Sequence, residues 1–287
     1  MTDSGCLPSV GAMVEATAED LAAAGVEMPR LEAQLLVAQV LGWSRLQVMT
    51  RPEHRIVEEY EEALGRLSSA RRRRAPLAYL IGRREFYGFE FSVGPGVLAP
   101  RPETELLVDL ALEEARRRGA VRMADVCTGS GCVAVALAAA LPGSRVLATD
   151  VSQAALACAA RNAAEQGVSG RVGLVRGHLA LPLRSGWAEI LVANPPYVPS
   201  SVASALQPEV ACYEPWLALD GGASGLAIFE ELALGARRAL EPGGLFASEI
   251  GYDQGAAAIT LLRDAGFADI VIVRDLAGLD RVVTGRA

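Results

Sequence analysis

Apolar residues in the first 75 positions recur at steps of three and four, with acids and arginines between them. This spacing gathers the apolar side chains on one face of each helix, so it predicts a series of amphipathic helices separated at Pro29 and at Gly42-Trp43. The pattern consists of Val10, Met13, Val14, Leu21, Leu31, Leu35, Leu36, Ala38, Val40 and Leu41, and then Ile56, Tyr60, Ala63, Leu64 and Leu67. Residues 1–75 are therefore predicted to form a small helical bundle that serves recognition or support.

The pattern changes over residues 76–98, where aromatic residues concentrate among glycines. Phe89-Glu90-Phe91-Ser92-Val93 alternates apolar and polar positions, which predicts a β-hairpin linker. Pro102 then fits the start of a helix over residues 106–117, and Thr104 or the acids beside it are candidates for the N-cap.

From residue 119 onward, short apolar runs alternate with helical patterns. This alternation predicts a doubly wound α/β domain over residues 99–287, with a mainly parallel sheet and an antiparallel strand near the end of the chain. The strands are expected at residues 121–126, 145–150, 171–175, 188–193, 243–250, 270–274 and 280–285. The helices between them are expected at residues 132–141, 152–166, 223–240 and 253–265.

The tetrapeptide Asn194-Pro195-Pro196-Tyr197 follows the apolar run of residues 188–193. The run predicts a buried parallel strand, and the two prolines end it because neither has an N–H group to donate. The stop presents an amide side chain, two carbonyl groups and an aromatic ring at the carboxyl edge of the sheet, where open α/β sheets bind ligands. An ordinary turn is the alternative reading, because Asn-Pro is a common turn dipeptide.

Composition and charge argue against several classes of protein. With 287 residues, of which 51% are hydrophobic, the chain can bury one large core or two smaller ones. A net charge of −7 and a pI of about 5.1 argue against general attraction to DNA, RNA or an anionic membrane. No apolar stretch is long enough to span a bilayer, and the N-terminal segment does not resemble a signal peptide.

Arginine supplies every one of the 27 basic residues, and a local run of it, Arg71-Arg72-Arg73-Arg74, ends the predicted bundle. We expect a solvated helix end, because arginine is favourable near the negative pole of a helix dipole. A contact with an acidic partner or with RNA phosphate is the alternative.

The cysteines and histidines do not have the spacing of a metal site or a disulfide framework. The cysteines are odd in number and lack C-x-x-C spacing, and the two histidines lie far apart, which fits a reducing, cytoplasmic environment. These residues are Cys6, Cys127, Cys132, Cys158, Cys212, His54 and His178.

A glycine-rich loop, Asp125-Val126-Cys127-Thr128-Gly129-Ser130-Gly131, follows the first predicted strand of the α/β domain. Its glycines let the backbone approach a ligand at the positive end of a helix, and Asp150, at the end of the next strand, can accept both ribose hydroxyl groups. The glycine spacing also satisfies the fingerprint of nicotinamide enzymes. S-adenosylmethionine is favoured, because Asp125 is placed to hold a methionine amino group and the run of residues 188–193 ends in a group suited to nitrogen transfer. A nicotinamide enzyme would typically need a His, Lys or Tyr for proton transfer, and the chain has no lysine and only two histidines.

In this order and spacing, the motifs resemble the HemK family, the N5-glutamine methyltransferases of peptide chain release factors. The resemblance covers nearly the whole chain and implies a class I, Rossmann-like methyltransferase domain. It also implies S-adenosylmethionine as methyl donor, S-adenosylhomocysteine as product, and the glutamine of a release factor Gly-Gly-Gln motif as acceptor. The matching segments are residues 75–82, 84–88, 98–105, Thr128-Gly129-Ser130-Gly131, Asn194-Pro195-Pro196-Tyr197, Glu214-Pro215, Glu249-Ile250-Gly251 and residues 275–278.

The resemblance implies roles for individual residues. The Asn194 side-chain oxygen and the Pro195 carbonyl are expected to accept hydrogen bonds from the acceptor NH2 group, with Tyr197 as a wall of the acceptor slot. The expected cofactor ligands are Asp125, Cys127, Thr128, Gly129, Ser130, Gly131, Asp150, Val151, His178, Leu179 and Asn194. Further substrate contacts are expected from Pro196, Arg101, Glu103 and Glu214, with Thr104 in a supporting place.

Several positions depart from the family pattern. Cys127 replaces a glycine, and we expect it to fit only if its φ angle is negative. His178 stands where related enzymes have an aspartate that contacts adenine, and Cys212-Tyr213 precedes Glu214-Pro215 without a physical explanation.

These departures leave other functions open. The main alternative is an N-methyltransferase of a free small molecule with an amide or guanidine nitrogen, such as arginine, with Glu103, Glu214 or Glu249 to neutralise a guanidinium group. DNA adenine methylation shares the Asn-Pro-Pro-Tyr motif, but the acidic chain argues against it. A non-catalytic module that binds S-adenosylmethionine or the ribosome is a further alternative.

Overall fold

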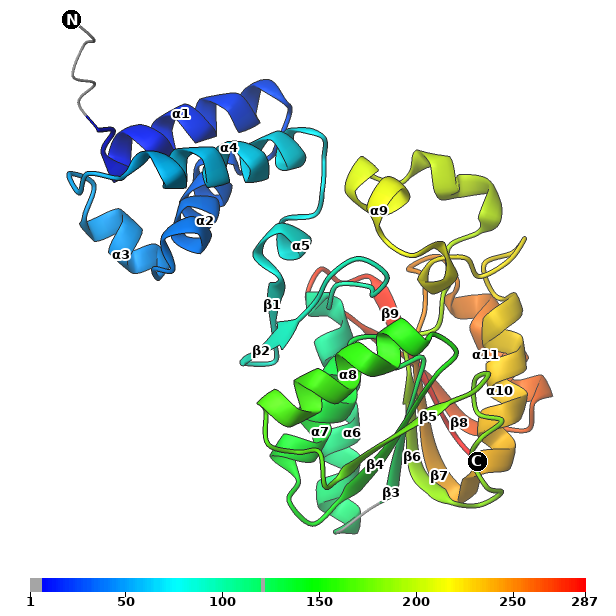
Figure 1. Ribbon diagram of the computed structural model, residues 1–287. Coiled ribbons are helices and arrows are strands. Elements are labelled where there is room, and N and C mark those ends of the chain that lie inside the picture. The colour runs from blue at the N-terminus through cyan, green and yellow to red at the C-terminus, as the bar shows by residue number, and fades with distance from the viewer. Residues whose placement is uncertain (1–6, 120–121) are drawn as a thin grey trace, which may run out of the picture. The chain divides into compact units, whose positions relative to one another are not determined.

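The computed structural model describes residues 7–119 and 122–287 (Figure 1). Within them the chain forms two compact units. The first comprises the chain up to Gly82 together with Gln207–Tyr213, and the second comprises Arg83–Leu206 and Glu214–Ala287. Cys6 and residue 121 of the first strand predicted for the α/β domain lie outside the described residues.

The first unit is helical, as the spacing of apolar residues predicts. Ser9 caps the first helix by accepting from the Ala12 N–H, and Gly42 ends the second in the left-handed conformation. Leu21 and Leu36 are fully buried in its core. The helices are α1 (Val10–Ala23), α2 (Pro29–Leu41), α3 (Arg45–Thr50), α4 (Glu58–Arg72), α5 (Leu77–Ile81) and α9 (Pro208–Tyr213).

The arginine run at the end of α4 is not a fully solvated helix end, so that expectation is wrong for two of its members. Arg71 is only 5% exposed and donates to Glu32 at 2.5 Å and to Glu209 at 2.9 Å. Arg74 donates to the other oxygen of Glu209 at 2.9 Å. The acidic partners of Arg71 and Arg74 therefore belong to the same unit, and Arg72 and Arg73 are the solvated members.

The second unit begins with an antiparallel hairpin, β1 (Arg83–Phe86) and β2 (Phe89–Ser92), which confirms the predicted hairpin. Residues 76–98 are divided between the units, because α5 precedes the hairpin and belongs to the first. Helices and strands then alternate. They are η1 (Pro102–Thr104), α6 (Glu105–Arg118), β3 (Arg122–Val126), α7 (Cys132–Ala140), β4 (Arg145–Asp150), α8 (Gln153–Glu165), β5 (Val172–Arg176), β6 (Ala188–Ala193), η2 (Ser200–Ala205), η3 (Trp216–Ala218), α10 (Ala227–Ala239), β7 (Leu240–Glu249), α11 (Gly255–Asp264), β8 (Ala268–Arg274) and β9 (Asp280–Arg286).

The large sheet of this unit has the strand order β5-β4-β3-β6-β7-β9-β8. Its pairs are parallel except that β9 runs antiparallel to both neighbours. Figure 1 shows α6, α7 and α8 on one face and α10 and α11 on the other. This is the predicted doubly wound α/β fold with its antiparallel strand. Within residues 7–119 and 122–287, no helix combines the length and apolarity needed to cross a bilayer.

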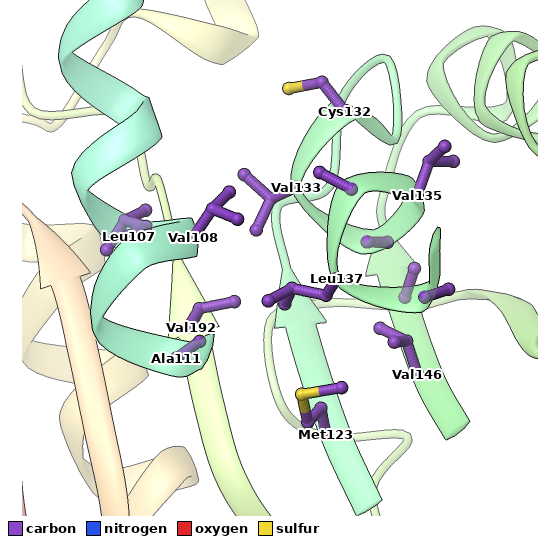
Figure 2. Close-up of a cluster of buried hydrophobic side chains, with 14 of the residues drawn as sticks. Leu107, Val108, Ala111, Met123, Cys132, Val133, Val135, Leu137, Val146 and Val192 are labelled. Carbon is purple, nitrogen blue, oxygen red and sulfur yellow. The ribbon is translucent and has the colours of Figure 1, made fainter. Parts of the chain in front are cut away.

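Alternate residues of each strand enter opposite cores, as the two-residue period of a strand requires. Met123 and Val192 pack under α6 and α7, whereas their neighbours Ala124 and Leu191 face α10 and α11. Figure 2 shows Val108 of α6 and Val133 of α7 pointing toward one another above these strands. Because α7 is apolar and buried all round, its N-terminus and the glycine loop before it are held firmly at the sheet edge.

Candidate active site

A cavity of about 370 Å³ lies at the carboxyl ends of β3, β4 and β6. The strand order reverses there, since β4 and β6 lie on opposite sides of β3, and such a point is the usual ligand site of an open α/β sheet. The predicted site residues that line it are Asp125, Cys127, Thr128, Gly129, Ser130, Asp150, Val151, His178, Leu179, Asn194, Pro196, Arg101 and the supporting Thr104. Those outside its lining are Gly131, Pro195, Tyr197, Glu103 and Glu214.

The glycine loop turns tightly from β3 into α7. Gly131 is the N-cap of α7 with a φ of 79°, and a Cβ atom there would lie 2.8 Å from the Cβ of Ala159 on α8. A side chain at this position therefore meets both backbone strain and a steric clash. Asn162, which the sequence patterns do not single out, holds the loop by donating to the Ser130 carbonyl at 2.8 Å. The sequence feature that could have pointed to Asn162 is a polar residue at a position on the buried face of a predicted helix.

Cys127 has a φ of 61°, so the expectation of a negative φ at this position is wrong. A non-glycine residue in this region carries a strain of about 1 to 2 kcal/mol. Burial raises the pKa of its thiol, which keeps the sulfur protonated. Cys127 thus lines the cavity as a neutral group, in a backbone conformation that suits glycine.

Two carboxyl groups face this cavity from neighbouring strands. Asp125 is 2% exposed, and its Oδ2 accepts from the Thr128 hydroxyl at 2.6 Å and the Ala134 N–H at 3.1 Å. Burial raises the pKa of Asp125 to about 7. Asp150 accepts from the Gly129 N–H at 2.9 Å, and burial raises its pKa as well. A cationic ligand would favour the ionised form of both groups, so the cavity favours a ligand with positive charge.

At the other end of the cavity, Asn194 follows β6 and joins a chain of buried hydrogen bonds. Its Nδ2 donates to the Thr104 hydroxyl at 3.1 Å, and Thr104 donates to Glu249 Oε2 at 2.7 Å. The Tyr197 hydroxyl donates to Glu249 Oε1 at 3.1 Å. Thr104 occupies the N-cap position of α6, as expected, but its side chain makes no cap hydrogen bond and joins Asn194 to Glu249 instead.

Arg101 and His178 reach the cavity from two further segments. Arg101 Nη2 donates to Glu214 Oε2 at 2.5 Å, and the Glu214 side chain is 2% exposed. His178 Nε2 lies 2.9 Å from Glu231 Oε1 at the surface. Neither partnership is visible in the sequence, since the partners stand 113 and 53 residues apart.

Sequence reasoning also missed part of the lining. Residues 96–100 and the segment Pro215, Trp216, Leu217, Ala218 and Asp220 border the cavity. Trp216 donates from Nε1 to Asp220 at 3.1 Å and keeps 42% of its surface exposed. The motifs Leu98-Ala99-Pro100 and Glu214-Pro215 were the available signals, but no periodic pattern marks these irregular segments.

Both units match known protein families. Residues 12–82 match the model of the PrmC N-terminal domain, and residues 102–208 match that of the methyltransferase small domain. The release factor glutamine methyltransferase of Caulobacter vibrioides is 41% identical over 262 residues, covering 91% of each chain. The enzyme of the same name from Moorella thermoacetica is 45% identical over 270 residues, covering 91% of this chain and 92% of that one.

The chain belongs to the release factor glutamine methyltransferase family. This confirms the family resemblance of the motifs. A methyltransferase structure from Pyrococcus furiosus has a TM-score of 0.53 at 16% identity, over 70% of this chain and 90% of that one, and supports the fold alone. Among the described residues, no group of three or more His, Cys, Asp or Glu side chains could hold a metal ion.

Proposed function

We propose that the chain transfers the methyl group of S-adenosylmethionine to the side-chain amide nitrogen of the glutamine in a release factor Gly-Gly-Gln motif. The observation that carries the proposal is the placement of Asn194 in the same cavity as Asp125 and Asp150. At one end of the cavity, Asp125 and Asp150 suit a positively charged ligand that carries a ribose. At the other end, the Asn194 side chain can orient an amide. The relatives that match 91% of this chain bear the name of that activity.

The described residues fit the cofactor. Asp125 would hold the methionine amino group, Asp150 would accept from the ribose hydroxyl groups, and Gly129 would let the backbone approach the ligand closely. Val151, His178 and Leu179 line the cavity where the adenine would lie. S-adenosylmethionine, when bound, supplies a methyl group that is electrophilic because it is attached to a positively charged sulfur.

The acceptor nitrogen needs positioning, because its lone pair is delocalised into the amide carbonyl. We infer that Asn194 Oδ1 and the Pro195 carbonyl accept from the two N–H bonds of the acceptor and aim its nitrogen into the cavity. Pro196 lines the cavity beside them. One N–H proton leaves after transfer; the methylated nitrogen is acidic, so no residue of the chain is assigned as a general base.

Arg101 and Glu214 are proposed to shape the acceptor side as an ion pair. Arg101 lines the cavity, and the buried Glu214 fixes its guanidinium group. The first unit is proposed to dock the release factor, which assigns the two units to recognition and chemistry. Release factors act in the cytoplasm, so we place the chain there.

Methylation of a free small molecule is not favoured, because the relatives that cover 91% of this chain are named for release factors. A methyl-transfer assay with labelled S-adenosylmethionine tests the choice. It offers in parallel a release factor with its Gly-Gly-Gln motif, the same factor with glutamine replaced by alanine, and free glutamine and arginine. We expect label on the intact factor alone. Label on arginine or glutamine, with none on the factor, would contradict the proposal.

The Asn194→Ala variant tests the assigned chemistry. It should lose transfer while binding of S-adenosylmethionine, measured by calorimetry, changes little. Equal loss of both properties would mean that Asn194 belongs to the cofactor site and does not orient the acceptor.

A further inference from the structure

The hydrogen bonds around Asn194 have a direction that follows from proton counting. Thr104 has one hydroxyl proton, and it donates this proton to Glu249 Oε2 at 2.7 Å. The Thr104 oxygen can then only accept from Asn194. This requires Asn194 to turn its NH2 group to Thr104, as the 3.1 Å contact shows, and its carbonyl oxygen away from it.

We propose that Thr104 and Glu249 are positioning residues that fix which end of the Asn194 amide faces the acceptor. An asparagine amide has nearly the same shape in its two flipped states, but one state presents an acceptor and the other a donor. Only the state with Oδ1 toward the substrate can hold an acceptor NH2 group. The catalytic consequence of this inference rests on the proposed function, whereas the orientation itself does not.

Burial makes this selection effective. Glu249 is 1% exposed and its bond from Thr104 is buried, and Thr104, which borders the cavity, is itself only 3% exposed. An unpaired polar group in such a place costs about 1 to 3 kcal/mol, which is enough to favour one flip state strongly. The same carboxylate accepts from Tyr197, so it also fixes the ring that follows the two prolines.

The charged groups that face Glu249 act in both directions. Burial raises its pKa, and Glu103 on η1 adds to this effect. The hydrogen bonds from Thr104 and Tyr197 and the charge of Arg281 on β9 lower the pKa and favour the carboxylate form. A proton on Glu249 would allow the whole chain of bonds to reverse, with Thr104 donating to the Asn194 oxygen instead.

Hydrogen exchange of the Asn194 side-chain NH2 group, followed by NMR, tests the orientation without any catalytic readout. The signal is identified by its loss in Asn194→Asp. We expect it to be protected in the native chain and in Thr104→Ser, and to exchange at least about 10-fold faster in Thr104→Val and Glu249→Gln. Equal protection in the native chain and in Thr104→Val would overturn the proposal. Thr104→Val keeps the carboxylate, so it remains informative if Glu249→Gln does not fold.

Steady-state kinetics with S-adenosylmethionine and a release factor supply the second readout. Thr104→Val should lower kcat roughly 10- to 100-fold with the affinity for S-adenosylmethionine retained, and Thr104→Ser should recover most of that loss. Thr284→Val, on β9 of the second unit and outside the cavity lining, controls for the loss of a hydroxyl group. A loss of the same size in Thr104→Ser and Thr104→Val would contradict a hydrogen-bonding role. If the native chain does not methylate the factor, the proposed function fails, and the exchange result alone decides the orientation.

Discussion

Glu114 on α6 and Arg286 on β9 form an ion pair with two parallel hydrogen bonds, of 2.5 Å and 2.9 Å. The residues are 172 positions apart in the chain. Arg118 donates to the same carboxylate at 2.7 Å, and the Glu114 side chain is only 5% exposed. The pair therefore joins the helix that follows the hairpin to the last strand of the sheet.

Glu114→Gln should destabilise the second unit by about 2 to 3 kcal/mol, because Arg286 would lose the carboxylate that holds it, whereas Arg118 keeps Glu241 at 2.9 Å. Unfolding in urea measures the change. Glu113→Gln is the matched control, because that side chain is 72% exposed and its nearest arginine nitrogen, on Arg117, lies as far as 4.0 Å away. A control loss as large as that of Glu114→Gln would show that the effect is not specific to this ion pair.

The Glu114 contribution should depend on pH in a defined direction. The hydrogen bonds from Arg286 and Arg118 lower the pKa of Glu114 from 4.5 to about 2, against the opposing effect of burial. A lowered carboxyl pKa stabilises the folded state above the unfolded pKa, and this stabilisation is lost as the pH falls toward the folded pKa. The stability difference between native chain and Glu114→Gln should thus be constant above a pH of about 5 and shrink below it. A difference that grows below this pH would contradict the assignment.

Arg71→Met should destabilise the first unit by about 3 to 5 kcal/mol, since Glu32 and Glu209 would lose their shared partner in a buried place. Arg72→Met changes the next residue in the same run, whose side chain is 55% exposed, and should change stability by less than about 0.5 kcal/mol. Denaturant unfolding monitored by helical circular dichroism compares the two. Similar losses in both variants would mean that the run acts as a whole through its net charge.

Cys127→Gly should stabilise the second unit by about 0.5 to 1 kcal/mol. Relief of left-handed strain gains about 1 to 2 kcal/mol, and the greater freedom of glycine in the unfolded chain offsets part of it. Cys127→Ala retains the Cβ atom and should show no such gain. Thermal unfolding of the three chains would decide, and a gain in Cys127→Ala as large as that in Cys127→Gly would point to the thiol instead.

The sequence predicted those features of the fold that depend on local pattern. The strands Arg145–Asp150 and Ala188–Ala193 have their expected bounds, because each is a short apolar run with polar or turn residues at its ends. The place of the glycine loop, Asp150 and Asn194 at one sheet edge also followed, since parallel strands bring their carboxyl ends together.

The pairing of distant residues could not be predicted in the same way. Thr104 and Glu249 are separated by 145 positions, and Arg71 and Glu209 by 138, so only the packed fold brings each pair into contact. The local pattern of Thr104 even favoured a side-chain helix cap, which the buried carboxylate of Glu249 overrides. The φ angle of Cys127, 61°, likewise is not marked by its residue type, because a cysteine gives no signal of the left-handed conformation.

Gly131→Ala should destabilise the second unit by at least about 2 kcal/mol and weaken S-adenosylmethionine binding, because it adds a steric overlap to an unfavourable φ. The overlap is with the Cβ of Ala159, so Ala159→Gly should recover part of the loss in the double variant. The expected coupling between the two changes is about 1 kcal/mol or more, measured from the four unfolding free energies of a double-mutant cycle. Gly129→Ala has a φ of 56° but no atom within 4 Å of its added Cβ, so the loss should be the smaller one and Ala159→Gly should not relieve it. Purely additive effects of Gly131→Ala and Ala159→Gly would mean that α8 moves away from the loop, and that backbone strain alone requires the glycine.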